Sequence, residues 1–498
     1  MKKMILCLLI AAAFIMLYSC GNDADTGING EQTPVNQDNG EEIVEQTEVP
    51  ARYTLPEADF NGSDFTVLVR NAGEGDRWAD HDFYAEEENG DPINDAVFRR
   101  NRLIESTYNI NLREIRNTNM YDTNSIRNQI MAGDTAFDVI AGIVQPTTAL
   151  VQEGALVNLL TVPNLNLSQP WWDQRCNENM TINNKLYFIS GDINTVDKSA
   201  TWAVMFNKQI LAENALDDHY ALVNSGKWTI DKMYENSRSI TQDLNGDGVL
   251  TPEDKWGAVN QYECGYSLFA SSGEKSVIKD ANDFPVLNIN TEKAASILSK
   301  VHEFLTDKTA QIKADDYRDQ YADVWMEVSV KMFMEDRALY FIAPLMLVPH
   351  LRSMETNFGI IPMPKYNEEQ ELYYSPMQYN NSTAISIPVT ATEDDLYRTG
   401  IILEMMCAES TETLRKAYYD ITLKVKMTRD DESAEMLDII FGNRAFDLGL
   451  TFNWNDMQNF YVDLLRQETF TFVSAFEKRE NTFTRAIDRT IDMFEKME

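Results

Sequence analysis

The most specific arrangement of chemically active residues is a run of oxygen-bearing groups between residues 243 and 254. They occupy loop positions 1, 3, 5, 7, 9 and 12, which are Asp243, Asn245, Asp247, Val249 (through its backbone carbonyl), Thr251 and Asp254. Gly246 stands at position 6, where such a loop turns sharply. Ca2+ takes six to eight hard oxygen ligands, so the run predicts a structural calcium site. The short Asp254 at the last position predicts modest affinity, with a Kd of about 10⁻⁴–10⁻³ M.

The same run can also be interpreted as a polar turn that starts a helix. Thr251 would then cap the helix, Pro252 would be its first residue, and Asp254 would complete a capping box. Both interpretations can hold at once. Dockerin modules use a similar loop, but they need a second, paired loop, and the chain contains none. The predicted calcium therefore stiffens the fold rather than forming a binding module.

The N-terminus predicts attachment to a membrane through lipid. Two lysines precede an apolar run at residues 5–17, and the run ends in Leu17-Tyr18-Ser19-Cys20. This order is typical of a bacterial lipoprotein signal peptide over residues 1–20, with cleavage leaving an acylated Cys20 as the first residue. Acyl chains such as palmitate would then anchor the protein stably. A plain secretory signal with an incidental cysteine is the alternative.

A tether and a large folded body follow the signal. Residues 21–50 hold eight acidic side chains, no basic one and no aromatic one. Such a segment cannot bury enough apolar surface to fold, so residues 21–55 are predicted to be a disordered tether. The roughly 440 remaining residues exceed one hydrophobic core, which predicts two lobes. No second apolar run is long enough to span a membrane.

Charge and motif content exclude several functions. A formal charge of −36 argues against nucleic acid, and it favours neutral or cationic solutes unless a local Arg or Lys cluster overrides it. The four histidines form no zinc motif, and the chain lacks a nucleophile elbow, a P-loop and a dinucleotide fingerprint. A glycosidase uses a pair of carboxylates, but among 79 acidic residues such pairs arise by chance and do not indicate one. We therefore expect no enzyme, with a secreted carbohydrate-active enzyme or a surface adhesion lipoprotein as the alternatives. Cys176, Cys264 and Cys407 allow one disulfide or three unpaired thiols.

Strand and helix patterns alternate in the first part of the folded body. Apolar runs predict strands at 65–69, 110–112 and 137–143, and helical spacing predicts helices at 93–108, 126–131 and 149–160. Later strands are expected at 202–206, 338–342, 358–361 and 384–387, with mostly helix from residue 394. The β-α-β-α order predicts an α/β fold with a largely parallel sheet. Ligands bind beyond the carboxyl ends of such strands, which points to loops 70–78 and 142–147.

Several motifs, taken in their order along the chain, resemble one known family. They are NDAVFRRNRLIESTYNINLREI at 94–115, FDVIAGIV with EGALVNLL within 137–160, QPWWD at 169–173, KLYFISGD at 185–192, FNK at 206–208, GKWT at 226–229, NFGIIPMPK at 357–365, and the stretch 418–430. The chain resembles the maltose-binding-protein-like group, extracellular solute-binding protein family 1, which serves carbohydrate ABC importers.

The resemblance implies a two-lobed, type II periplasmic-binding-protein-like fold that closes on its ligand about a hinge. It implies an N-terminal lobe of 56–195 plus 338–383 and a C-terminal lobe of 196–337 plus 384–498, with crossings near 193–202, 338–342 and 381–386. It further implies a monomer that binds a mono- or oligosaccharide and delivers it to the ABC permease. The protein would stand on the outer face of the cell membrane, or in the periplasm of a Gram-negative cell.

A sugar site needs flat aromatic faces and planar polar groups near the cleft loops. The candidates are Arg70, Trp78, Gln145, Trp171, Trp172, Asp192, Trp202, Tyr379, Asn381 and Trp454. A single Trp is more often part of a core. The Trp171-Trp172 pair is the strongest candidate, because adjacent side chains should point in different directions and one should face the cleft.

Overall fold

The computed structural model describes residues 53–71, 73, 76–133, 136–419 and 431–497. The predicted signal peptide, Cys20 and the tether up to residue 52 lie outside the described residues. The tether was expected to extend to residue 55, but Tyr53 already belongs to the folded body. Its hydroxyl donates a hydrogen bond of 2.7 Å to Glu409, and its ring packs edge-on against Trp171.

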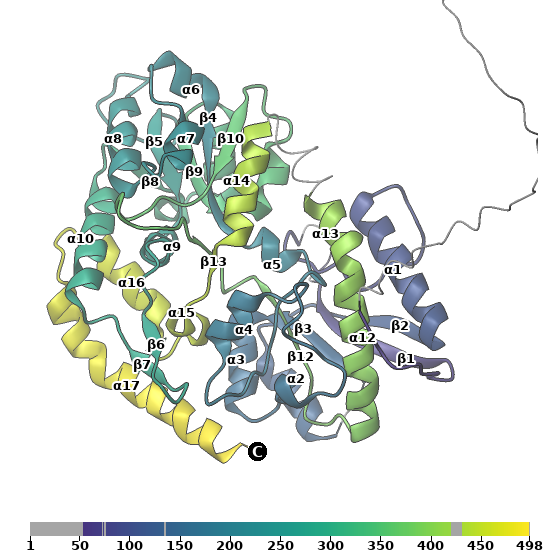
Figure 1. Ribbon diagram of the computed structural model, residues 1–498. Helices are drawn as coiled ribbons and strands as arrows, with labels where there is room; N and C mark the ends of the chain where they lie inside the picture. Colours follow the sequence, from purple (N-terminus) through teal and green to yellow (C-terminus); the bar gives the residue numbers. More distant parts are fainter. Residues whose placement is uncertain (1–52, 72, 74–75, 134–135, 420–430, 498) are drawn as a thin grey trace, which may run out of the picture. The chain divides into compact units, whose positions relative to one another are not determined.

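The first lobe is built on a four-stranded sheet of order β12-β3-β1-β2 (Figure 1). Its strands are β1 (Ser63–Arg70), β2 (Ile110–Asn117), β3 (Val139–Ile143) and β12 (Thr383–Ser386). β1 pairs in parallel with β2 and β3, and β12 runs antiparallel to β3. The first three strands confirm the predicted parallel α/β arrangement.

Helices of the first lobe begin and end where the sequence supplies the caps. They are α1 (Pro92–Tyr108), α2 (Thr123–Met131), α3 (Val144–Gln152) and α12 (Glu393–Glu412). Asp91 accepts two backbone N–H groups at the start of α1, and Thr392 with Asp395 forms a capping box at the start of α12. The helix expected at 149–160 is displaced to α3, which begins directly after β3. It ends before Gly154, whose φ of +66° interrupts the helix.

The second lobe is built on a five-stranded sheet of order β10-β4-β9-β5-β8. Its strands are β4 (Trp202–Asn207), β5 (Trp256–Asn260), β8 (Gln311–Lys313), β9 (Ala338–Pro344) and β10 (Phe358–Ile361). β4 runs antiparallel to β9 and β10, whereas β5 runs parallel to β8 and β9. All residues of β4, β5, β9 and β10 are buried, as expected for a sheet covered on both faces.

The expected division of the chain between the lobes is wrong for residues 338–361, which were expected in the first lobe as part of 338–383. β9 and β10 hydrogen-bond to β4, so they belong to the second lobe, and the crossing expected at 338–342 lies inside β9. β12 joins the sheet of the first lobe and α12 packs against α1, so residues 384–412 belong to the first lobe rather than the second. The crossings near 193–202 and 381–386 agree with the sheets.

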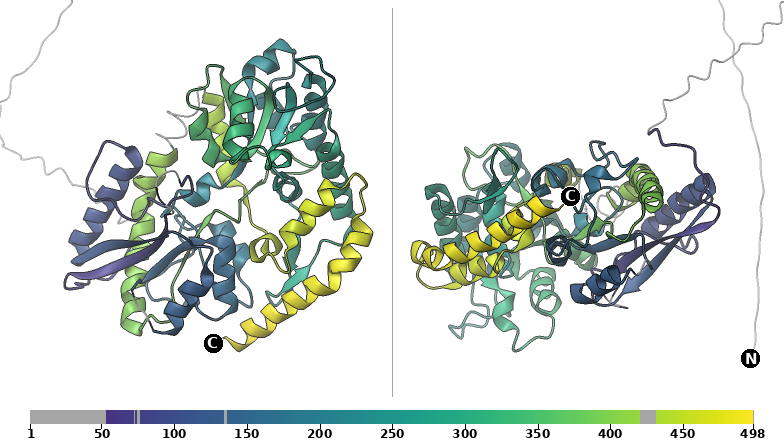
Figure 2. Two further views of the ribbon diagram at one scale, coloured as in Figure 1. Left: turned by 180° about the vertical axis from the view of Figure 1, so that it is seen from behind. Right: turned by 90° about the horizontal axis from the view of Figure 1, so that it is seen from below.

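The remaining elements are mostly helices, in the last third as expected. They are α4 (Gln174–Met180), α5 (Val196–Ser199), α6 (Lys208–Glu213), α7 (His219–Asn224), α8 (Ile230–Ile240), α9 (Cys264–Ser271), α10 (Glu292–Thr306), α11 (Lys331–Met334), α13 (Leu414–Lys416), α14 (Asp431–Gly442), α15 (Leu448–Phe452), α16 (Met457–Arg466) and α17 (Phe472–Lys496). Two short sheets pair β6 (Val277–Lys279) with β7 (Pro285–Leu287) and β11 (Ser375–Pro376) with β13 (Arg444–Ala445). α14 packs against β10 of the second lobe, and the long α17 lies beside α16 (Figure 2).

The three described cysteines resolve the disulfide alternatives. Cys176, Cys264 and Cys407 are all buried and unpaired. Among the described residues, no helix combines the length and apolar character needed to cross a membrane.

Candidate functional site

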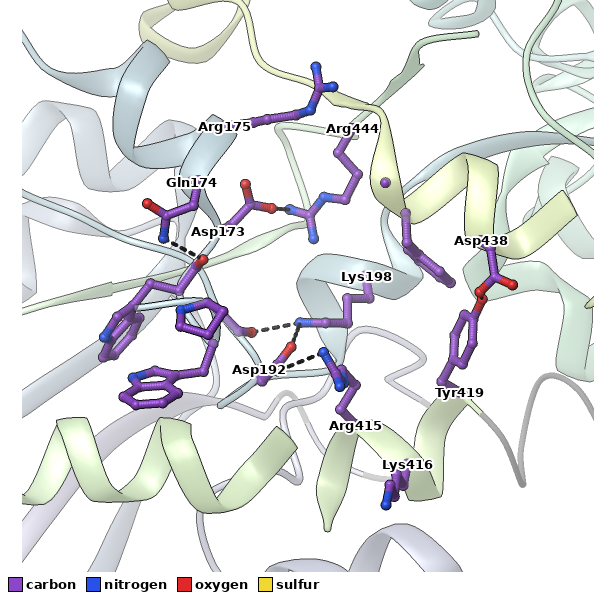
Figure 3. Close-up of a pocket in the computed structure, with 16 residues that line it drawn as sticks. Asp173, Gln174, Arg175, Asp192, Lys198, Arg415, Lys416, Tyr419, Asp438 and Arg444 are labelled. Atoms are coloured by element: carbon purple, nitrogen blue, oxygen red, sulfur yellow. Dashed lines mark hydrogen bonds and ion pairs between the residues drawn. The ribbon is translucent and has the colours of Figure 1, made fainter. Parts of the chain in front are cut away.

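A cavity of about 640 Å³ lies where segments of the first lobe meet α14 (Figure 3). Residues 170–175, Gly191 and Asp192 form one wall, the end of α14 lines the cavity across from it, and Arg444 reaches Asp173 of the first wall. Lys198 of α5 and residues 415–419 complete the lining. Its size suits a small ligand, and its position between the lobes is where hinge closure would act.

Asp192 joins three parts of the first lobe at the cavity wall. One carboxylate oxygen accepts a 2.8 Å hydrogen bond from Thr411 and lies 3.2 Å from Arg415. The other lies 3.8 Å from the ammonium of Lys198. Burial raises the pKa of Asp192, although Lys198 and Arg415 oppose the rise. The predicted ligand residue Asp192 therefore lines the cavity and positions two cations there.

Arg444 is the most deeply buried cation of the site, with only 4% of its side chain exposed. Its Nη1 donates a 2.9 Å hydrogen bond to Asp197 of α5, and its Nη2 lies 3.5 Å from Asp173. Burial alone would raise the pKa of Asp197, but Lys198 and Arg444 outweigh burial and lower it. Ser190 also donates to Asp197. This network ties the segment before β4 to β13.

Arg175 stands on the wall that this cavity shares with a second one of about 410 Å³. Its Nη2 donates a 3.1 Å hydrogen bond to Asn443, and its guanidinium lies 5.9 Å from the ring centre of Tyr374. On the opposite side, the Tyr419 hydroxyl donates to the carboxylate of Asp438, as Figure 3 shows.

Trp171 and Trp172 border the cavity but are only 4% and 1% exposed. Both indole N–H groups donate to one carboxylate, that of Glu404, over 3.1 and 2.9 Å. The expectation that the two rings point in different directions is therefore wrong. The pair sits in a turn, closed by a bond from Trp172 N–H to the Gln169 carbonyl, rather than in an extended strand whose side chains alternate.

Arg70 and Asn381 come together as a pair, but they do not line the cavity. Arg70 donates a 3.0 Å hydrogen bond to the Asn381 side chain and stacks over the ring of Tyr121. Gln145 donates its backbone N–H to the Tyr379 carbonyl, and the half-buried Trp78 packs against the core. The described residues of loops 70–78 and 142–147 therefore do not line this cavity.

Three predicted aromatic residues belong to the core, because Trp202 and Tyr379 are fully buried and Trp454 is 2% exposed. Trp454 stacks on Phe452 and donates to Thr490. The Tyr379 hydroxyl accepts the backbone N–H of Asp447. None of these rings presents a face to a ligand, which corrects the expectation that they line the cleft.

Most charged groups of the cavity were not foreseen from the sequence. They are Asp173, Arg175, Lys198, Arg415, Lys416, Asp438 and Arg444. Asp173 and Arg175 directly follow the Trp171-Trp172 pair, and this adjacency was an available signal. Lys198 follows Asp192 within the predicted crossing at 193–202. Arg415, Lys416, Asp438 and Arg444 come from distant segments, and the local sequence marks none of them.

The predicted calcium loop forms the expected tight turn. Gly246 has a φ of +75°, and the carboxylate of Asp243 accepts the N–H groups of Gly246 and Gly248 at 2.6 and 2.8 Å. Asp254 accepts the N–H groups of Leu244 and Thr251, but residues 252–254 form a turn that leads into β5, so the helix expected to start at Thr251 is wrong. Among the described residues, no three His, Cys, Asp or Glu side chains converge to hold a metal. The six-ligand calcium site stays a prediction.

Two α/β lobes with a cavity between them define the fold of the type II, maltose-binding-like solute-binding proteins. One solved structure with this fold is the ABC substrate-binding protein Lmo0181 of Listeria monocytogenes in complex with cycloalternan, at 11% identity and a TM-score of 0.52 over 87% of this chain and 99% of that one. A cyclo/maltodextrin-binding protein complexed with maltotetraose shares 12% sequence identity and a TM-score of 0.52, over 87% of this chain and 98% of that one. A family 1 extracellular solute-binding protein of Bifidobacterium longum subsp. infantis shares 12% identity and a TM-score of 0.51, over 87% of this chain and 99% of that one.

No family model matches the sequence, and no curated protein matches it. At identities of 11–12%, the three structures establish a common fold and leave the ligand open.

Proposed function

We propose that this protein is the substrate-binding subunit of an ABC importer, which captures a saccharide between its lobes and releases it unchanged to the permease. The observation that carries the proposal is the cavity between two α/β lobes in a fold whose solved examples hold oligosaccharides. The cavity walls come from both lobes, so a ligand there would couple to their relative motion. Most of the lining charges are held in ion pairs, such as those of Asp192 with Lys198 and Arg415, which suits a rigid binding wall.

The proposal includes the location and the calcium. The protein is held on the outer face of the membrane by acyl chains on Cys20, and the loop 243–254 binds one structural Ca2+. Asp243, Asn245, Asp247, Thr251 and Asp254 would supply side-chain oxygens, with Val249 supplying a carbonyl. The protein acts as a monomer and catalyses no reaction.

A saccharide panel tests the function directly. Thermal-shift screening finds a ligand, small-angle X-ray scattering measures the radius of gyration with and without it, and chromatography follows the ligand for a day. We expect a raised melting temperature, a smaller radius of gyration and an unchanged saccharide. Conversion of the saccharide into product would refute the proposal in favour of an enzyme, and polymer binding without compaction would favour an adhesin. Copurification with two permease subunits tests delivery.

A further inference from the structure

We propose that the ligand carries a carboxylate, as in a uronic acid, and that Arg175 binds it at the junction of two cavities. This inference rests on the proposed function and specifies its substrate class. The net charge of −36 makes such a ligand unexpected, because the field of the whole chain repels anions. A cation without an anionic partner is therefore required in the cavity.

The first cavity holds such a cation. Five of the described side chains that line it are cationic and three are carboxylates, and two further carboxylates, those of Asp197 and Glu412, pair with Lys198, Arg444 and Lys416. Four of the five cations therefore have an anionic partner, and Arg175 has none among the described residues. The carboxylates are already engaged: Asp173 lies beside Arg444, Asp192 beside Lys198 and Arg415, and Asp438 accepts the Tyr419 hydroxyl. A further anion would meet cations rather than exposed carboxylates.

Arg175 is the lining cation with N–H donors left for a ligand. Among the described residues, its guanidinium makes one hydrogen bond, to the neutral side chain of Asn443, and no ion pair. A guanidinium carries five N–H donors in a planar fork that matches a carboxylate in a two-point contact. Arg175 is also partly exposed, so a ligand can reach it.

Arg444 adds a second positive charge at the junction of the two cavities. Like Arg175, it lines both cavities. Its Nε and Nη2 are buried and have no hydrogen-bond partner among the described residues. Buried donors without a hydrogen-bond partner are uncommon in folded proteins, and they keep the positive charge of Arg444 at this junction. Because Arg444 is only 4% exposed, an acidic saccharide would place its carboxylate on Arg175 and extend into each cavity.

Calorimetric titration of the purified protein tests the inference with paired probes. Trigalacturonate and a chondroitin disaccharide are compared with fully methyl-esterified trigalacturonate and with maltotriose. We expect at least one acidic probe to bind. The Arg175→Gln variant should weaken its binding at least tenfold, and esterification should weaken trigalacturonate similarly if that probe binds. Arg99→Gln removes the same charge from an exposed position on α1 and should leave the affinity unchanged.

Each outcome decides the matter. Binding of the neutral probes alone, or a change below threefold in Arg175→Gln, would overturn the carboxylate assignment while leaving the proposed function intact. Absence of binding by every probe would also overturn the carboxylate assignment, and the saccharide panel described above then decides the proposed function separately. Equal melting temperatures of the two variants show that any loss reflects the contact rather than the fold.

Discussion

Replacing Asp197 by Asn should destabilise the protein strongly, because the change leaves Arg444 as a buried charge without its closest partner. Asp197 is 1% exposed and lies 2.9 Å from Arg444. Two opposite charges about 4 Å apart attract by roughly 4 kcal/mol at an effective dielectric constant of about 20. Breaking a buried pair costs about 3–5 kcal/mol. We expect Asp197→Asn to lower the free energy of unfolding by that amount at pH 7.

The assay is urea denaturation followed by circular dichroism, with two comparisons. Asp231→Asn removes an exposed carboxylate 2.6 Å from Lys300, so it should cost about 0–1 kcal/mol. The double variant Asp197→Asn with Arg444→Met removes both buried charges, and it should be more stable than Asp197→Asn alone. This order follows because the penalty comes from the unpaired cation rather than from the missing bond.

The pH dependence gives a second check on the same pair. The pKa of Asp197 is lowered in the folded protein, so its stabilising effect is present above the unfolded value of 3.8 and is lost as the pH falls through the folded pKa. The difference between the wild type and Asp197→Asn should therefore be largest at neutral pH and shrink below about pH 4. A cost under 1 kcal/mol at pH 7, or a difference that grows as the pH falls, would refute the reasoning.

Three further outcomes are expected. Chelation by EDTA should lower the melting temperature, while ligand binding at low temperature persists. A melting temperature that EDTA leaves unchanged, with or without added Ca2+, would exclude the calcium site in loop 243–254. Burial, with Asp315 nearby, raises the pKa of Glu263 from 4.5 to about 7, so stability should fall as the pH rises through this window. In urea titrations, Glu263→Gln should abolish this loss of stability and raise the free energy of unfolding at pH 8 by up to about 3 kcal/mol. The same dependence of stability on pH in the variant and the wild type would contradict this. Gly400→Ala would place a Cβ 1.8 Å from the Pro163 carbonyl oxygen and should cost about 1–3 kcal/mol, whereas Gly442→Ala meets nothing within 4 Å and should cost nothing by the same assay; equal effects would show that the close contact relaxes.

The strands were predictable because each is a short apolar run between polar residues. The runs at 65–69, 202–206 and 358–361 fall within β1, β4 and β10. Their partners were not predictable in the same way. β9 follows β4 by more than 130 residues, and the hydrogen bonds between them are decided by packing over the whole lobe rather than by a local pattern. The assignment of residues 338–361 to the first lobe failed for this reason.

The site was predicted only where its residues are close in sequence. Asp192 and the Trp171-Trp172 pair border the cavity, as expected from the motifs around them. Arg415 and Arg444 reach it from the far end of the chain, and nothing in the neighbouring sequence distinguishes them from the other cations of the chain. The directions of the two indole rings also depended on the turn at 169–172 and on Glu404, which lies over 230 residues away.

The carboxylate of Glu404, shared by Trp171 and Trp172, should make the fluorescence of these two residues sensitive to ligand binding. Indole emission responds to nearby charge, and both rings touch the same ionisable group while bordering the cavity. A molecule that binds in the cavity would change the electric field at the two rings. Tryptophan fluorescence excited at about 295 nm should therefore change on ligand binding, and the measurement needs no added dye.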